Sequence, residues 1–349
     1  MNIPSTENTG NDKNLRNSQH IRRAIPRSGR AGFATVTIIL GAAAAFAFPG
    51  RATATATATA TDSRDVTSAD SSTAPAVAAT SVSATVAKSS LLDSLFGRSR
   101  KLRARFVSPT QSASIPVLRE VFGENAVTRT GVYATTDEEF GTFHLVTMRP
   151  FTDKVNGRIG TYRIGTFPSE HRAKTANPSG FLEITTDNQD TRISEHFKLR
   201  DFLTKDQFAV WPKYLVLREP LIDKLELVID ELRLMGVPVN RMKVMSGFRT
   251  PQYNAKGVGS GGRVDNSRHQ YGDAADVYII NGSKDWMSDL NGDGKVNTKD
   301  AQVLATAAER VEQKYPDLVG GLGIYKATSA HGPFVHIDVR GNRARWSSL

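Results

Sequence analysis

The chain has 349 residues, a formal net charge of +10 at pH 7 and no cysteine. Without cysteine it has neither disulfide bonds nor thiolate ligands, so a transition metal would have to bind through histidine and carboxylate side chains. The excess of positive charge favours an anionic surrounding such as a cell-envelope polymer or a membrane surface, and because no basic motif is interleaved with aromatic residues we expect no nucleic-acid partner.

Three segments without a predicted core come first. Residues 1–30 are polar and basic, and we expect them to be a cytoplasmic tail. Residues 31–50 contain an uncharged apolar run and predict a signal peptide or a membrane anchor, with an Ala-Phe-Ala cleavage sequence at residues 45–47. Residues 51–112 predict a low-complexity linker, because alanine, serine and threonine bury too little apolar surface to fold. Together they predict a protein of the cell envelope or periplasm, either exported or anchored in the membrane.

Short β-type runs broken by turn residues occupy residues 113–192, among them GTFHLVTM and GRIGTYRIGTF. They predict a small β-rich subdomain. In the remaining part, residues 193–349, a helix is expected to begin at Pro220, to present leucines on one face and to end at Gly236. A short strand from Val244 then leads into a turn that carries Arg249. At such a turn a guanidinium suits a cleft, where it would bind a substrate carboxylate or stabilise an oxyanion.

Two histidines and one aspartate have the spacing of a metal site. His269 and Asp276 lie seven residues apart across a run of small residues, so a loop and the strand after it can bring both side chains to one point. His336, in FVHIDVRG, would complete the set. Two histidines and one carboxylate leave a tetrahedral cation such as Zn²⁺ one open position, which suits the holding of a water molecule.

Three separated motifs carry a resemblance to a known family. SGFRTPQYN (246–254), SRHQYGDAAD (267–276) and FVHIDVRG (334–341) resemble, in matching order, the zinc D-alanyl-D-alanine carboxypeptidases and related peptidoglycan endopeptidases, over about residues 197–346. The resemblance implies an α+β fold for residues 193–349, with a small antiparallel sheet and flanking helices. It also implies Zn²⁺ on His269, Asp276 and His336, with Arg249 near the substrate and Ser267 lining the site.

The general base is left open by a departure from the family pattern. Several members carry Glu three residues before the late zinc histidine, or His two residues before it, and these places hold Pro333 and Phe334 here. His331 and Asp338 are the two candidates. On a strand, Asp338 would point to the same face as His336, where it would reach a bound water or instead hydrogen-bond a ligand imidazole from behind.

A second metal motif lies within the same domain, at residues 289–300. Oxygen-bearing side chains stand at positions 1, 3, 5 and 12 of a twelve-residue loop, with glycine at position 6. The pattern resembles the calcium loops of EF-hand and dockerin proteins, and a helix is expected from residue 301 to residue 315. It predicts a structural Ca²⁺ site, with position 7 contributing a backbone carbonyl: Asp289, Asn291, Asp293, Lys295 and Asp300.

The resemblance implies a zinc-dependent peptidoglycan peptidase that acts on peptide bonds of D-amino acids in the bacterial wall, with peptidoglycan peptides as its partners. In the implied mechanism, zinc lowers the pKa of its water, the water attacks an amide carbonyl, and Arg249 and the metal stabilise the oxyanion. The sequence does not separate a carboxypeptidase from a cross-link endopeptidase. A different class is a wall-binding or morphogenetic module that keeps the zinc fold without turnover.

Overall fold

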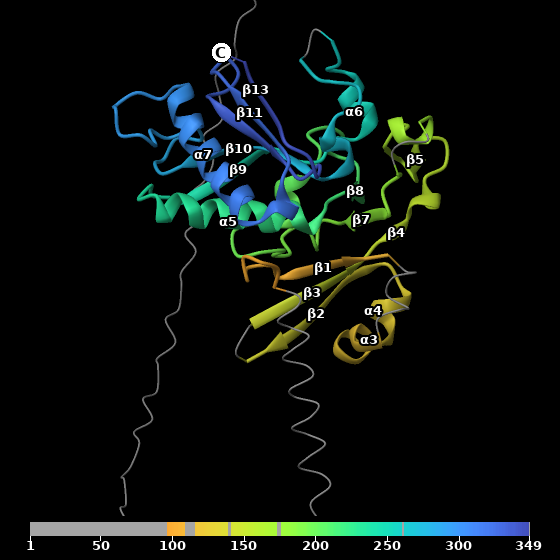
Figure 1. The fold of residues 1–349 in the computed structure, drawn as a ribbon. Helices are drawn as coiled ribbons and strands as arrows, with labels where there is room; N and C mark the ends of the chain where they lie inside the picture. The colour runs from red at the N-terminus through yellow and green to blue at the C-terminus, as the bar shows by residue number, and fades with distance from the viewer. Residues whose placement is uncertain (1–95, 109–115, 139–140, 173–175, 260–261, 349) are drawn as a thin grey trace, which may run out of the picture. The chain divides into compact units, whose positions relative to one another are not determined.

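The structure is a computed structural model that describes residues 96–108, 116–138, 141–172, 176–259 and 262–348 (Figure 1). All of these residues belong to one compact unit of the chain, residues 72–349. The predicted tail, the predicted signal or anchor and most of the predicted linker lie outside the described residues. No helix in the described ranges is both long and apolar enough to span a membrane.

A five-stranded sheet is the largest element of the fold and has the strand order β13-β11-β12-β10-β9. Neighbouring strands run antiparallel except β11 and β13, which are parallel. With helices beside it, the sheet gives a mixed α+β fold, as predicted. The strands are β9 (Arg241–Ser246), β10 (Ala274–Ile280), β11 (Gly321–Tyr325), β12 (Phe334–Asp338) and β13 (Ala344–Ser348).

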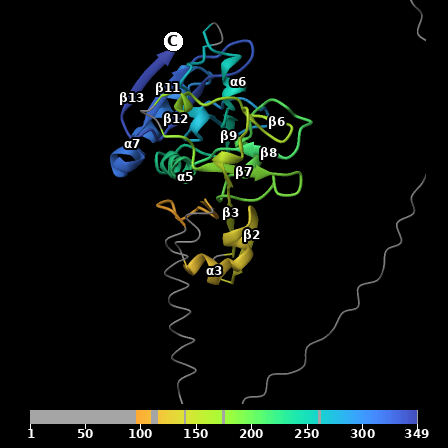
Figure 2. The ribbon, with the colours of Figure 1, turned by 90° about the vertical axis from the view of Figure 1, so that its right-hand side faces the viewer.

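Two long helices, α5 (Glu219–Leu234) and α7 (Thr298–Lys314), pack against each other, and α7 also contacts β11 and β12 (Figure 2). Helix α5 has proline in its first turn and ends before Gly236, whose φ of 78° stops the helix. Helix α7 begins with a capping box made by Asn297 and Asp300. The short helices are α6 (Pro251–Ala255), η3 (Leu199–Phe202), η4 (Arg268–Tyr271) and η5 (Pro316–Leu318).

Residues 96–184 form small sheets and short helices. Strand β3 (Gly141–Thr147) is the centre of a sheet with β1 (Ala104–Val107) and β2 (Gly131–Asp137), and Leu145 packs with α3 (Pro116–Phe122) and α4 (Glu124–Thr128) in a small separate core. The other elements are β4 (Arg149–Pro150), η1 (Phe151–Asp153), β5 (Arg158–Ile159), β6 (Tyr162–Arg163), η2 (Pro168–Glu170), β7 (Gly180–Ile184) and β8 (Lys213–Leu215).

The end of the predicted linker is folded in the structure. Residues 96–108 were expected in the linker 51–112, yet β1 pairs with β3 in parallel and Leu102 is buried in the main hydrophobic core. The carboxylate of Asp223 on α5 accepts the backbone N–H groups of Arg98 and Ser99, at 2.8 and 2.9 Å. The linker prediction followed composition, whereas these contacts come from partners that are distant in sequence, on β3 and on α5. Strand β7 likewise pairs with β8, across the boundary predicted at residue 192.

Candidate metal centre

One row of cross-strand partners runs the full width of the five-stranded sheet. Ser246 on β9 is opposite Asp276 on β10, Asp276 is opposite His336 on β12, His336 is opposite Gly323 on β11, and Gly323 is opposite Trp346 on β13. Side chains in register on neighbouring strands point to the same face of a sheet. The row therefore places two predicted metal ligands on one face, with Ser246 and Trp346 at its two ends.

The third predicted ligand comes from outside the sheet. His269 lies on η4, whose last residue precedes Gly272, and Gly272 has the left-handed φ of 66° that turns the chain toward β10. The Nε2 atom of His269 lies 3.2 Å from Nδ1 of His336 and 3.2 Å from Oδ1 of Asp276. His336 Nδ1 lies 3.0 Å from the same Asp276 oxygen. The structure thus brings the three predicted ligands together.

These three side chains form a buried cluster. In the described part of the chain they are the only group of three or more histidine, cysteine, aspartate or glutamate side chains whose ligand atoms all lie within 4.8 Å of one another. In a tetrahedral zinc site with bonds of roughly 2.0–2.1 Å, ligand atoms are roughly 3.3 Å apart. The observed separations of 3.0 to 3.2 Å are close to that value, so the cluster could hold a metal ion.

Hydrogen bonds behind the imidazoles fix which nitrogen of each ring faces the cluster. His269 Nδ1 donates to the backbone carbonyl of Gly247 at 2.7 Å, and His336 Nε2 donates to the carboxylate of Asp338 at 3.0 Å. Because a carbonyl and a carboxylate only accept hydrogen bonds, these nitrogens carry the protons. His269 Nε2 and His336 Nδ1 are the nitrogens that would bind a cation through their lone pairs, the usual tautomer arrangement of metal-binding histidines.

Charge in the cluster follows from burial and from neighbouring ionic groups. Burial lowers the pKa of His269, although Asp276 acts in the opposite direction. For Asp276, burial would raise the pKa, but the two histidines and Arg249 outweigh it and hold the pKa well below its usual range. His336 has a raised pKa because its bonds to Asp276 and Asp338 outweigh its burial. Asp276 is thus a carboxylate anion that is ready to bind a cation.

Arg249 holds the ligand carboxylate from the other side. It follows β9 in the turn before α6, and its Nε donates to Ser246 Oγ at 2.8 Å. Its guanidinium also donates to Asp276 Oδ2, so Oδ1 of that carboxylate is left for the histidine side. Arg249 was predicted to lie near the substrate, and in the structure it lies beside the ligand cluster, in the wall of a hollow.

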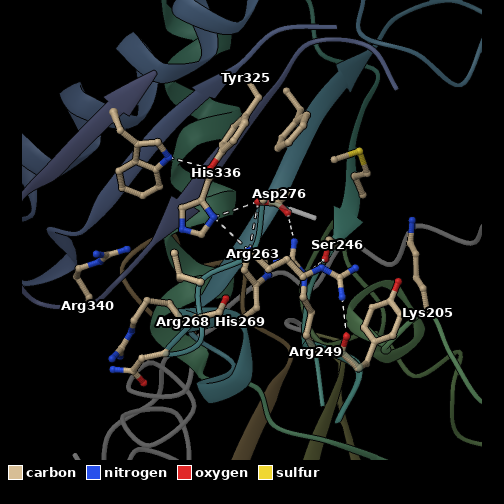
Figure 3. A pocket seen from close by; sticks show the side chains of 18 of the residues that line it. Lys205, Ser246, Arg249, Arg263, Arg268, His269, Asp276, Tyr325, His336 and Arg340 are labelled. Atoms are coloured by element: carbon tan, nitrogen blue, oxygen red, sulfur yellow. Dashed lines mark hydrogen bonds and ion pairs between the residues drawn. The ribbon is translucent and has the colours of Figure 1, made fainter. Parts of the chain in front are cut away.

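The three ligands line a hollow of about 1020 Å³ (Figure 3). Ser267 and His331, both predicted from the sequence, line it as well. Its walls carry five basic side chains and one acidic side chain, Asp276, so positive groups outnumber negative ones in its lining. Arg340 and Lys205 lie on opposite sides of the cluster in Figure 3. The basic residues are Lys205, Arg249, Arg263, Arg268 and Arg340.

The two candidate bases differ in position. Asp338 is fully buried behind His336, and its oxygens also accept from Gly321 N–H at 2.7 Å and from Arg340 Nε at 2.9 Å. Burial alone would raise its pKa, but the bonds from His336 and Arg340 dominate and lower it. His331 lines the hollow, and its Nδ1 donates to the carbonyl of Gly332 at 2.9 Å. That bond leaves the Nε2 lone pair of His331 as a proton acceptor.

The predicted calcium loop forms a compact turn before α7. Both oxygens of Asp289 accept backbone N–H groups, from Gly292 at 2.8 Å and from Gly294 at 2.7 Å. These bonds, that of Gly294 first, lower the pKa of Asp289. Asp300 is buried and accepts from Leu290 N–H at 2.7 Å. The side chains of Asn291, Asp293 and Asn297 each accept from a backbone N–H two residues later.

Aromatic residues of the hollow were not singled out from the sequence. Trp346 Nε1 donates to the hydroxyl of Tyr325 at 2.9 Å, and its ring centroid is 5.1 Å from that of His336. The ring of Tyr325 stacks on Phe334, with centroids 4.6 Å apart. The sequence GLGIY (321–325) held one signal of them: glycine at Gly321 and Gly323 leaves one face of a strand without side chains, so that a neighbouring ring can lie across it.

Comparisons of the chain with protein-family models, with curated proteins and with solved structures found no match in any of the three. The likeness of the three motifs to zinc D-alanyl-D-alanine carboxypeptidases therefore stays a prediction.

Proposed function

We propose that the protein is a zinc-dependent peptidase that hydrolyses peptide bonds of D-amino acids in bacterial peptidoglycan, as a D,D-carboxypeptidase or as a cross-link endopeptidase. The observation that carries the proposal is the cluster of His269, Asp276 and His336, which is buried and yet lines a large hollow. Three protein ligands leave a tetrahedral zinc ion one position for a small molecule, which is typical of hydrolytic zinc sites and not of structural ones.

Zinc bound by these ligands would supply a Lewis acid that polarises a carbonyl and activates water. The chain supplies the remaining groups. Arg249 uses two of its nitrogens for Ser246 and Asp276, and its third nitrogen has no partner among the described residues. That nitrogen is the donor we assign to the oxygen that gains negative charge when the peptide carbonyl is attacked.

His331 is the residue that we assign as general base. It lines the hollow, and its Nε2 lone pair is left free to take a proton. Asp338 has its oxygens engaged by His336, Arg340 and Gly321, on the side of His336 away from the cluster. We therefore assign Asp338 to the positioning of His336, the second of its two predicted roles.

The charge of the hollow supports an acidic substrate. Of the five basic side chains in its walls, Arg268 and Arg340 are ion-paired with the buried carboxylates of Asp273 and Asp338. Lys205 and Arg263 have no carboxylate within ion-pair distance in the described ranges. Peptides of the bacterial wall carry free carboxylates, and such groups are steered into a positive cleft.

The test is to incubate the purified protein with muropeptides and to resolve the products by mass spectrometry. Loss of one terminal D-alanine would mean a carboxypeptidase, and conversion of dimers to monomers an endopeptidase. His269→Ala and a chelator should each abolish the reaction, because each removes the metal. His171→Ala is the matched control, since His171 is exposed and does not line the hollow.

The alternative is a wall-binding module without turnover. It is favoured by Pro333 and Phe334, which stand where the family carries an acid or a histidine. Unchanged muropeptides in the presence of protein that contains stoichiometric zinc would contradict the peptidase and support this alternative.

A further inference from the structure

Tyr325 lies in the wall of the hollow and has one hydrogen bond whose direction is fixed. Its hydroxyl lies 2.9 Å from Nε1 of Trp346. An indole N–H can only donate a hydrogen bond, so the tyrosine oxygen is the acceptor. The O–H proton of Tyr325 must then point elsewhere, and no acceptor for it is found among the described residues. The hydroxyl is therefore an unused hydrogen-bond donor in the wall of the hollow.

The position of Trp346 depends on a residue without a side chain. Gly323 lies between His336 and Trp346 in the row across the sheet, and a Cβ atom at Gly323 would overlap the indole ring. The missing side chain lets the indole lie across β11 and reach the ring of His336. The guanidinium carbon of Arg340 lies 5.4 Å from the centroid of the indole ring. Trp346 is thus fixed from three sides.

The ring of Tyr325 is fixed as well. It lies opposite Phe334 in the register of β11 and β12, and the two rings stack with an interplanar angle of 5°. Figure 3 shows its hydroxyl pointing toward the side of the pocket that holds His336 and Asp276. Burial raises the pKa of Tyr325 and outweighs the hydrogen bond from Trp346, which lowers it.

We propose that the Tyr325 hydroxyl is a catalytic hydrogen-bond donor to the oxygen of the substrate carbonyl, and that Trp346 is a positioning residue that turns the O–H proton toward the substrate. The inference rests on the proposed peptidase function. Arg249, in the turn after β9, and Tyr325, at the end of β11, then approach the reacting carbonyl oxygen from different elements, and no proton has to leave Tyr325 during the reaction. A donor held in place before the reaction costs no reorganisation when the negative charge develops.

The experiment compares Tyr325→Phe with the wild type in muropeptide hydrolysis. Removal of one preorganised donor to an oxyanion lowers kcat by roughly 100-fold to 1000-fold. We expect a loss in that range with KM and zinc content nearly unchanged, because the phenyl ring keeps its stacking on Phe334. Trp346→Phe, which keeps a ring beside His336 but has no N–H, should lower kcat less and again leave KM nearly unchanged.

Tyr133→Phe is the matched control, since the Tyr133 hydroxyl donates to the carbonyl of Arg129 far from the pocket residues, and this variant should behave as the wild type. Hydrolysis by Tyr325→Phe at the wild-type rate, with zinc bound, would overturn the inference and leave the proposed peptidase standing. A loss in Tyr325→Phe that is explained by lost zinc or by unfolding would also overturn it. A wild-type protein that hydrolyses no muropeptide would instead overturn the peptidase itself, and this inference with it.

Discussion

At the scale of single residues, His336 lies between two carboxylates that have different tasks. Asp276 contacts its Nδ1 on the side of the ligand cluster, whereas Asp338 contacts its Nε2 from behind. Asp338 is in turn held by Arg340 and by the backbone of Gly321. A carboxylate in that place fixes the ring and makes the imidazole a better ligand.

Asp338→Asn is therefore expected to weaken zinc binding without removing a ligand. Changes behind a metal-binding histidine raise the dissociation constant by about 10-fold to 100-fold. Competition with a chelating dye measures the change, with circular dichroism to show that the variant is folded. Asp187→Asn, at an exposed carboxylate, is the control and should bind zinc as the wild type does. Equal zinc affinity in Asp338→Asn and the control would rule out the positioning role.

The residues of the cluster could be predicted from the sequence, but their surroundings could not. His269, Asp276 and His336 stand in three sequence motifs that predicted them as one metal site. Tyr325 and Trp346 reach the same pocket only through the register of β11 with β12 and β13, and register follows from packing across the whole sheet. The two candidate bases were not separated by sequence for the same reason.

At the scale of elements, the loop at residues 289–300 carries the oxygen groups of a calcium motif, and several of these groups accept hydrogen bonds from backbone N–H groups of the same loop. Asp289 already accepts two backbone N–H groups, so its replacement should loosen the turn even without a cation. The predicted site is therefore tested only by a change in stability that depends on the presence of Ca²⁺.

We expect Ca²⁺ to raise the thermal unfolding temperature of the wild type and to have no effect on Asp289→Asn combined with Asp293→Asn. A ligand that binds the folded state alone stabilises it by about 2.7 kcal/mol at 100 times its dissociation constant. Thermal unfolding with and without Ca²⁺ measures this, and Asp187→Asn should respond as the wild type. A wild type that gains nothing from Ca²⁺ would contradict the predicted site.

Helices were easier to predict than sheets. The bounds of α5 agree with the positions of Pro220 and Gly236, because those residues start and stop a helix by local backbone chemistry. The parallel pairing of β11 with β13 has no comparable local signal, since it joins strands through a long connection. The α+β class was therefore within reach of the sequence, and the strand order was not.

At the scale of the whole molecule, the segment 96–108 belongs to the folded unit. Leu102 is 2% exposed in the main core, and its backbone pairs with that of Ser194. Deleting a buried leucine side chain leaves a cavity as well as losing apolar contacts. The fold thus depends on a segment whose composition predicted a linker.

Leu102→Ala should lower the free energy of unfolding by about 2–5 kcal/mol, the range for leucine to alanine in a core. Urea denaturation monitored by tryptophan fluorescence measures it. Leu234→Ala is the matched control, because Leu234 is 76% exposed at the end of α5, and the same change there should shift stability by about 0.5 kcal/mol or less. Equal effects of the two substitutions would mean that residues 96–108 add nothing to the folded state.

The row across the sheet also sets an order of events in folding. The three ligands of the cluster are distant in sequence: Asp276 and His336 are 60 residues apart, and His269 and His336 are 67 residues apart. Closing so long a loop costs conformational entropy, and strand pairing and core formation must offset that cost before the ligand atoms can come together. A cation bound by these residues would then arrive at a finished sheet and would not nucleate it, unlike the metal of a zinc finger, so the proposed zinc uptake is expected to be a late kinetic phase that reports on completed strand pairing.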